Sequence, residues 1–351
     1  MIEIKTGNCL EVLKTIPEQS VNTCVTSPPF WGLRDYGTAT WEGGDENCDH
    51  QVGRFEHKVS DKQKSNTASA GHQARDVCPK CGAIRKDSQL GLEDTPEEYV
   101  ENLVKLFREV RRVLRDDGTV WLNLGDSYSS GGRTTTTNQT LRGDKDYGAT
   151  RPKPSKNIKP KDLIGIPWRV AFALQADGWY LRQDIIWHKP NPMPESVTDR
   201  CTKAHEYIFL LSKSLKYYFD NEAIKEDAVG NEPGNKTKHR AVGQHFSETK
   251  NNIDKIGAVN KRNKRSVWTV TTKPFKGAHF ATFPPDLIEP CVLAGCPENG
   301  TVLDPFGGAG TTGLVAQQHN RNAVLIELNP EYAEMSRKRI YNDAPLFSNI
   351  L

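Results

Sequence analysis

The sequence predicts an α/β fold, because strand and helix patterns alternate at both ends of the chain. Residues 1–30 read as strand, helix and strand, and the residues from 301 onward as strand, helix, strand and helix. In the second run a glycine-rich turn joins a strand to a helix, as in nucleotide-binding βαβ units. A chain of 351 residues is long enough for one large domain with insertions, or for two domains.

The first elements follow from apolar spacing. Ile2 and Ile4 alternate with charged residues, a Gly7-Asn8 turn follows, and residues 9–16 have helical spacing. The start has no apolar signal region, and no apolar run approaches the length that spans a bilayer. Eight scattered cysteines do not make a disulfide framework in a chain this long. We therefore expect a soluble, cytoplasmic protein with no membrane partner.

The predicted strand 21–25 runs into an unusual turn, Thr26-Ser27-Pro28-Pro29-Phe30. Each proline fixes φ and removes an N–H donor, so the strand stops while the carbonyl acceptors remain. Ser27 adds a hydroxyl and Phe30 adds a flat apolar face. This combination suits a planar group that carries an NH₂. The alternative is a strand-terminating turn with a buried phenylalanine.

Residues 34–94 are polar and contain a candidate metal site. Cys78 and Cys81 form a C-x₂-C turn followed by glycine, which is a common half of a structural zinc site, and Cys48 and His50 are the expected second half. Such a site would order a segment too polar to build a core. His57 and His72 are alternative ligands, and a metal-free loop with reduced thiols is the alternative interpretation.

Between residues 95 and 220 the α/β pattern returns. Thr95 is the expected N-cap of a long helix with Pro96 at its first position, and Asp116-Asp117-Gly118 is expected to end it. We expect Cys24, Trp31, Trp168 and Trp187 in the core or at its rim. The remaining elements are expected at residues 119–124, 166–177, 180–187 and 205–211.

Positive charge is concentrated in two segments, although the net charge is only +3. Residues 131–165 hold eight Lys and Arg against three Asp and Glu, and residues 236–276 hold eleven against two. The rest of the chain is net acidic. Local positive fields attract phosphate, so this distribution indicates a polyanionic partner, whereas two solvated loops are the alternative.

The C-terminal part contains a predicted nucleotide site. A helix is expected at 285–293 and a strand at 301–303, followed by Asp304-Pro305-Phe306-Gly307-Gly308-Ala309-Gly310 and a helix at 311–318. Glycines let a ligand approach the backbone, and Glu327, at the end of the next strand, can accept from ribose hydroxyls. There is no G-x-G-x-x-G and no Lys-Ser/Thr after the glycines, which disfavours a dinucleotide and a triphosphate.

These motifs resemble the amino-directed DNA methyltransferases that use S-adenosylmethionine, with 27–30 as the catalytic and 304–310 as the cofactor motif. Their order resembles the beta group, which implies a Rossmann-like fold with a mostly parallel seven-stranded sheet. The zinc-like insert and residues 166–211 resemble the corresponding parts of phage and prophage members of the group. This resemblance implies that the protein is located in the cytoplasm of a bacterial or phage-infected cell.

The resemblance also implies roles for single residues. The cofactor would pack against Phe306, Gly307, Gly308 and Gly310. Asp304 and Thr311 would belong to the same site, and Glu327 would hold the ribose. Phe283 matches the segment that closes over the methionine end. Asn8 lies where family members contact the adenine amine of the cofactor, and its side-chain carbonyl oxygen would accept that hydrogen bond.

The predicted chemistry follows from the residue types. Ser27 Oγ and the Pro28 carbonyl would accept the two hydrogens of an exocyclic amine, with Pro29 stiffening the turn and Phe30 stacking on a base that has left the duplex. By the same resemblance, family members with serine before the two prolines mostly modify N4 of cytosine, which makes cytosine N4 the expected target and N6 of adenine the alternative. An RNA methyltransferase and a catalytically inactive zinc-containing nucleic-acid-binding protein are further alternatives.

These predictions together give an expected organisation. Double-stranded DNA is the expected partner of a monomer or homodimer, and zinc and S-adenosylmethionine are the expected cofactors. The expected units are a catalytic half of the core at 1–33, a zinc insert at 34–94, core at 95–220 with a mobile basic loop at 129–161, a target-recognition insert at 221–265, and a cofactor-binding part at 266–351.

Overall fold

A computed structural model describes residues 1–32, 38–50, 77–129, 158–228, 260–273 and 282–343. At its centre lies an eight-stranded sheet. Every neighbouring pair in it is parallel except those made by β7, so the sheet is mostly parallel, as predicted. The strand order is β1 (Ile2–Thr6), β12 (Asn322–Glu327), β11 (Thr301–Asp304), β2 (Val21–Thr26), β5 (Leu114–Leu124), β7 (His205–Ser212), β6 (Tyr180–His188) and β10 (Val267–Thr269).

The eighth strand is an addition to the seven that the resemblance implies. β10 has three residues and pairs with the outer side of β6. The side chain of Trp268 in this strand is buried, which anchors the short strand to the core. Its neighbours Val267 and Thr269 are exposed, so the apolar pattern here is too short to identify a strand.

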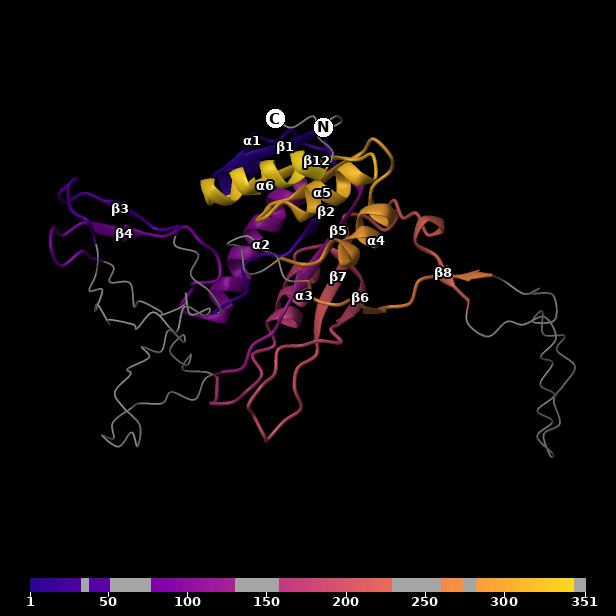
Figure 1. Cartoon of the computed structure of the whole chain (residues 1–351), viewed down its shortest axis with the longest axis horizontal. Helices are drawn as coiled ribbons and strands as arrows, with labels where there is room; N and C mark the ends of the chain where they lie inside the picture. The colour runs from indigo at the N-terminus through magenta and orange to yellow at the C-terminus, as the bar shows by residue number, and fades with distance from the viewer. Residues whose placement is uncertain (33–37, 51–76, 130–157, 229–259, 274–281, 344–351) are drawn as a thin grey trace, which may run out of the picture.

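Helices cover both faces of the sheet, giving three layers (Figure 1). One face packs against α1 (Cys9–Thr15), α2 (Pro96–Val113) and α3 (Ile166–Ala176), and the other against α4 (Pro285–Gly295), α5 (Thr311–Gln318) and α6 (Pro330–Asp343). Each face of the sheet carries its own cluster of buried apolar side chains: the first lies under α1, α2 and α3, and the second under α4, α5 and α6. Neighbouring residues of one strand point to opposite faces, so Leu303 belongs to the first cluster and Val302 to the second.

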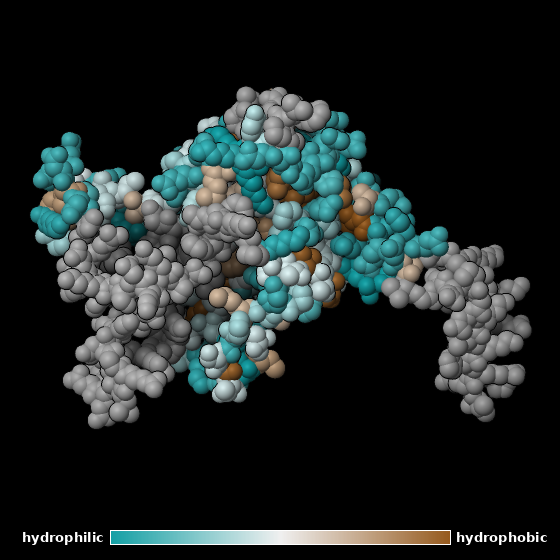
Figure 2. All heavy atoms as spheres, in the orientation of Figure 1, coloured by the Kyte–Doolittle hydropathy of each residue, from teal (hydrophilic) through white to brown (hydrophobic). Residues whose placement is uncertain are grey.

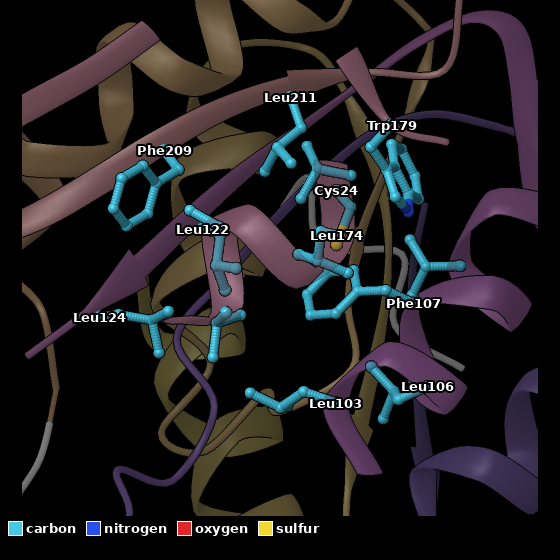
Figure 3. Packing of buried hydrophobic residues seen from close by; sticks show 14 of the residues in the cluster. Cys24, Leu103, Leu106, Phe107, Leu122, Leu124, Leu174, Trp179, Phe209 and Leu211 are labelled. Carbon is cyan, nitrogen blue, oxygen red and sulfur yellow. The ribbon is translucent and has the colours of Figure 1, made fainter. Parts of the chain in front are cut away.

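Of the residues expected in the core or at its rim, Cys24 and Trp31 belong to the first cluster, with Trp168 packed against it, and Trp187 belongs to the second. Side chains of α2 and α3 meet those of β5 and β7, and the Cys24 thiol lies among them (Figure 3). Cys24 is fully buried, and burial raises the pKa of its thiol. Trp31 and Trp187 are also buried, while Trp168 packs half-buried against this cluster. These core predictions are confirmed.

Helix α2 begins as predicted but ends earlier than expected. Thr95 forms a capping box with Glu98, and Pro96 occupies the first turn. The helix ends at Val113, and residues 114–124 form one long strand, so 116–118 is not the helix end. The early strand residues pair with β2 through an irregular register, which tertiary pairing imposes and helical spacing does not reveal.

Two small antiparallel hairpins lie outside the central sheet. One pairs β3 (Thr40–Glu42) with β4 (Ile84–Lys86), and the other pairs β8 (Glu226–Asp227) with β9 (Lys261–Arg262), after the short 3₁₀ helix η1 (Glu222–Ile224). The β3–β4 projection has a mostly hydrophilic surface (Figure 2).

Several predicted segments lie wholly or largely outside the described residues. They are most of the basic loop 129–161, residues 229–259 of the recognition insert, and the alternative metal ligands His57 and His72. Among the helices that the structure describes, none combines the length and apolar character needed to cross a bilayer.

Candidate active site and metal centre

The carboxyl ends of the parallel strands meet at one edge of the sheet, and a cavity of about 1020 Å³ opens there. Ligands of open α/β sheets bind at this edge because loops of several strands converge on it. The cavity is lined by every residue predicted for the catalytic and cofactor sites except Gly310: Asn8, Ser27, Pro28, Pro29, Phe30, Phe283, Asp304, Phe306, Gly307, Gly308, Thr311 and Glu327.

The glycine turn after β11 is held against the last strand and helix. Gly307 donates to the Ile326 carbonyl over 2.7 Å. Gly310 has φ +76°, and a Cβ there would lie 2.1 Å from Ser336 Oγ, so a side chain at this position would collide with α6. Gly310 therefore faces α6 rather than the cavity, and its contribution is to shape the turn.

Asp304, at the end of β11, stabilises this turn through hydrogen bonds to its carboxylate. Its buried carboxylate accepts hydrogen bonds of 2.6 Å from Thr26 Oγ1 and from Thr312 Oγ1, and one of 3.1 Å from the Phe306 amide. Burial raises the pKa of this carboxyl. The Asp304 side chain thus joins β2 to α5, and both of its oxygens are already hydrogen-bonded.

Glu327 closes the end of β12 at the cavity wall. Its carboxylate accepts from the Gly308 amide over 2.8 Å and from the Asn329 amide over 2.9 Å. Burial raises its pKa above the ordinary value of a glutamate. A carboxylate has about four acceptor positions, so two backbone donors leave capacity for ligand hydroxyls.

Two residues predicted to touch a cofactor have structural partners. Asn8 is the N-cap of α1, and its Oδ1 accepts from the Leu10 amide over 2.9 Å. Thr311 Oγ1 accepts from Arg339 over 2.9 Å, and the same guanidinium nitrogen binds the Ala309 carbonyl over 3.0 Å. Both residues still line the cavity, as does Phe283, which packs against the second core cluster.

The turn after β2 presents two unpaired acceptors. Tyr99 donates its hydroxyl to the Pro29 carbonyl over 2.8 Å, which fixes the turn from α2. Within the part of the chain that the structure describes, the Ser27 hydroxyl and the Pro28 carbonyl have no hydrogen-bond partner. Both residues line the cavity, so these acceptors are available to a ligand.

Phe30 forms the adjacent wall of the cavity. A Cβ on Gly125, at the end of β5, would lie 2.6 Å from Phe30 Cε2, so the ring occupies the space that a side chain would need. Phe30 is half-buried and packs against the first core cluster. The ring is therefore held in place and lines the cavity with an aromatic surface.

A polar network that sequence reasoning did not assign lies on the β5–β7–β6 side of the cavity. Asn123 Nδ2 donates to Glu206 over 3.2 Å, and Glu206 forms an ion pair with Lys189. The Lys189 ammonium lies 4.1 Å from the centre of the Trp187 ring. A single amide in an otherwise apolar strand was the available signal for Asn123. Lys203, another lining residue, has its pKa lowered by burial.

Asp126, two residues after β5, both caps a helix and lines the cavity. Its Oδ1 accepts from the Gly165 amide over 3.0 Å and the Ile166 amide over 3.1 Å, which caps α3 from a distant loop.

The four predicted metal ligands come together outside the central sheet. Cys48, His50, Cys78 and Cys81 place one ligand atom each within 4.8 Å of all the others. The Cys48 and Cys78 sulfurs are 3.8 Å apart, and Cys81 Sγ lies 3.5 Å from His50 Nδ1. Tetrahedral zinc with Zn–S bonds of about 2.3 Å separates its sulfurs by about 3.8 Å, so the donor set fits zinc.

The backbone around the cluster is shaped for this arrangement. The Gly82 amide donates to the Cys78 carbonyl over 2.9 Å, which closes the C-x₂-C turn. A Cβ on Gly44 would lie 2.8 Å from Cys81 Sγ. Trp41 stacks on the His50 ring at 5.0 Å and 15°, which orients the imidazole. The interaction with His50 lowers the pKa of the Cys78 thiol to about 6, favouring the thiolate that binds metals.

Comparisons with known proteins point to one family. The model of a DNA methylase family matches residues 21–338. The chain is 44% identical over 341 residues to the type II methyltransferase M.SmaI of Serratia marcescens, covering 96% of this chain and 90% of the relative. It is 42% identical over 337 residues to M.Cfr9I of Citrobacter freundii, covering 96% and 87%.

Solved structures share the fold. The PvuII DNA methyltransferase, described as cytosine-N4-specific, aligns with a TM-score of 0.57 at 17% identity, over 100% of this chain and 95% of that one. A putative DNA modification methylase of Thermus thermophilus, complexed with S-adenosyl-L-methionine, aligns with a TM-score of 0.53 at 20% identity over 100% of both chains.

Proposed function

The chain belongs to the DNA methylase family and is a DNA methyltransferase, and we propose that it moves a methyl group from S-adenosylmethionine to the N4 amine of cytosine in double-stranded DNA. The observation that carries the proposal is the pair of unpaired acceptors, Ser27 Oγ and the Pro28 carbonyl, in one cavity with the glycine turn and Glu327. An amine acceptor pair and a nucleoside site in a single cavity suit methyl transfer to a base.

The two acceptors address the main chemical obstacle, since the lone pair of an exocyclic amine is delocalised into the ring. Hydrogen bonds from both amine hydrogens to Ser27 and Pro28 favour the geometry in which this pair points at the methyl group. The pair forms the new N–C bond as the C–S bond breaks, and the surplus proton then leaves to solvent. The sulfonium is already a good leaving group, so positioning supplies much of the remaining catalysis.

The other half of the cavity would hold S-adenosylmethionine. Glu327 accepts from ribose hydroxyls with the capacity left by its two backbone donors. The turn from Phe306 to Gly308 carries little side-chain bulk beyond the phenylalanine, so the ligand approaches the backbone closely. Phe283 covers the methionine end.

Access to this cavity requires the target base to leave the duplex, because its amine is otherwise held in a base pair. The Phe30 ring, immobilised against Gly125, then stacks on the extruded base. Cytosine N4 is preferred over adenine N6 on the identity of Ser27, the residue before the two prolines.

Nucleoside mass spectrometry tests this proposal. After incubation with labelled S-adenosylmethionine and duplex DNA, we expect N4-methylcytosine as the modified nucleoside. N6-methyladenine alone would contradict the target base, and transfer to RNA alone would contradict the substrate. Ser27→Ala should retain cofactor affinity and lose about hundredfold in kcat, by analogy with the loss of one positioned hydrogen-bonding group.

The cysteine–histidine cluster is assigned to a structural zinc ion. Three thiolates and one imidazole at tetrahedral spacing favour Zn²⁺ over harder cations. The ion would join residues 48–50 to residues 78–81 and so close a hairpin that contributes few large buried side chains of its own.

A further inference from the structure

The loop that joins β6 to β7, residues 189–204, leaves the sheet at the same edge as Ser27. It projects beyond the ends of these two strands (Figure 1). Three of its residues, Pro190, Pro192 and Pro194, have fixed φ angles, which stiffens the segment. Residues 191–195 line the mouth of the active-site cavity together with Lys203.

The rest of the molecule holds this loop in place at its start. The Lys189 amide donates to the Ala204 carbonyl over 2.8 Å, which continues the β6–β7 pairing. Asn191 forms two hydrogen bonds with the backbone of Thr272, of 3.2 Å and 3.0 Å. The first proline-rich part of the loop is thus tied to the segment that follows β10.

A second set of contacts holds the returning part of the loop. Arg200 forms an ion pair with Glu195 and lies 3.8 Å from the centre of the Tyr128 ring. Asp199 forms an ion pair of 2.6 Å with Lys161. The loop is therefore braced on both sides, and residues 192–194 span the interval between the braces.

Met193 lies in this interval, and its side chain is unusually exposed to solvent. Its side chain is 88% exposed, the highest value among the large hydrophobic residues that the structure describes. A lone exposed apolar side chain is common on protein surfaces, but this one is held by a braced, proline-rich segment that lines the active-site cavity. Its position at the mouth of the cavity indicates that it contacts the substrate when the substrate docks.

Given the proposed function, we propose that Met193 inserts into the DNA duplex and fills the space that the target base leaves when it enters the cavity. Extruding a base costs a few kcal/mol in lost stacking and pairing. Apolar side chains, methionine among them, insert between base steps in other DNA-binding proteins, and in the gap left by an extruded base such a side chain would contact the bases on either side and offset part of this cost. Methionine suits this role because it is unbranched and polarisable.

The test compares Met193→Ala with Val197→Ala. Val197 lies on the same loop and is 41% exposed, but it does not line the cavity. Each variant is assayed by labelled-methyl transfer on two duplexes carrying the recognised site, which is first mapped by sequencing DNA from an expressing host. One duplex is fully paired, and the other has an abasic site opposite the target base, so that extrusion is already favoured.

We expect Met193→Ala to lose at least about tenfold in kcat/KM on the paired duplex, which corresponds to about 1.4 kcal/mol. The same variant should stay within about twofold of the native chain on the abasic duplex, where the cost of extrusion is lower. Met193→Leu retains apolar bulk and should retain most activity on both duplexes, and Val197→Ala should match the native chain on both.

Equal losses on the two duplexes would overturn the inference, because they would place Met193 in the base pocket or in the fold. An unchanged Met193→Ala would overturn it as well. Cofactor affinity and the thermal melting temperature of each variant identify a folding defect. If Met193→Ala has such a defect, the activity of Met193→Leu on the two duplexes decides whether the inference holds. Failure of the native chain to methylate either duplex would instead overturn the proposed function, and the inference with it.

Discussion

The Phe30 ring owes its position to the absence of a side chain at Gly125. A Cβ at that position would lie 2.6 Å from Phe30 Cε2, a distance that real Cβ contacts do not show. Gly125→Ala should therefore displace the ring and lower kcat by about tenfold or more, since small misplacements of a substrate-positioning group are costly. Cofactor affinity, measured by calorimetry, should change little because Glu327 and the glycine turn lie on other strands.

A double-mutant cycle with Phe30→Ala isolates this contact. If the alanine at 125 acts through the ring, its effect should largely disappear once the ring is removed. Additive losses in kcat would contradict the explanation.

The environment of Glu327 predicts a pH dependence of cofactor binding. Burial raises the pKa of this carboxyl above its ordinary value of 4.5. The charged form, which would accept from ribose hydroxyls in the proposed site, is therefore lost at a higher pH than for an exposed glutamate. S-adenosylmethionine affinity should fall on acidification, beginning above pH 4.5. Titration calorimetry across this range checks it, and Glu327→Gln, weaker at neutral pH, should show no such fall.

At single positions the sequence predicted which residues line the cavity, but not which protein groups their side chains bind. Asp304, Asn8 and Thr311 all line the predicted cavity, yet each side chain binds protein groups. A motif states which residues lie near a ligand, whereas the partner of a side chain depends on elements far away in sequence. The role of Arg339 in bracing the glycine turn, 28 residues after Thr311, could not be predicted for the same reason.

The β3–β4 hairpin connects the cysteine–histidine cluster to the catalytic turn. After β4 the chain reaches Gly91, whose carbonyl accepts from the Gly32 amide over 2.8 Å. The Trp31 indole donates to the Glu93 carbonyl over 2.9 Å. The segment that follows the proposed zinc site therefore packs directly against the residues that follow Phe30.

Cys78→Ser should remove the metal and loosen this connection. We expect about one zinc per native chain and well under half of that in the variant, measured by mass spectrometry of the metal. Methyl transfer should fall more than cofactor affinity, because the segment after the hairpin contacts the catalytic turn, whereas the glycine turn is held by β12 and α6.

Cys201→Ser is the matched control, since Cys201 is exposed and lies outside the cluster. Zinc absent from the native chain, or retained by the Cys78 variant, would contradict the assignment.

Elements with strong local signals were predicted closely, and those that depend on pairing were not. Helix α5 spans the predicted residues 311–318, and α2 begins at the predicted cap. The end of α2 was misplaced and β10 was missed, because residues 114–118 and 267–269 become strands through their neighbours in the sheet. The cluster ligands were predicted from their spacing and chemistry, which are local signals.

At the scale of the whole molecule, the candidate active site joins the two ends of the chain. β2, which carries the catalytic turn, lies beside β11, which carries the glycine turn, although some 280 residues separate them. The predicted order of the two motifs fits this topology. What the sequence could not provide is the third wall, which consists of Asn123 in β5, Glu206 in β7 and Lys189, the first residue after β6.

The outlying β8–β9 hairpin makes the proposed recognition insert removable. Glu226 pairs with Arg262 in this hairpin and forms an ion pair of 2.9 Å with it. The Ala228 amide donates to the Asn260 carbonyl over 3.0 Å, so the two residues that flank 229–259 lie within hydrogen-bonding distance of each other. A short glycine linker can therefore replace this segment without displacing the core strands.

We expect this deletion to preserve S-adenosylmethionine affinity within about twofold, since the contacts that hold the glycine turn come from β12 and α6. Selection of the DNA site should be lost, because the adjacent basic residues still attract phosphate while the side chains proposed to read base edges are gone. Calorimetry measures the first quantity, and modification-sensitive sequencing of host DNA measures the second. A parallel loss of cofactor affinity and site selection would show that the segment supports the core instead.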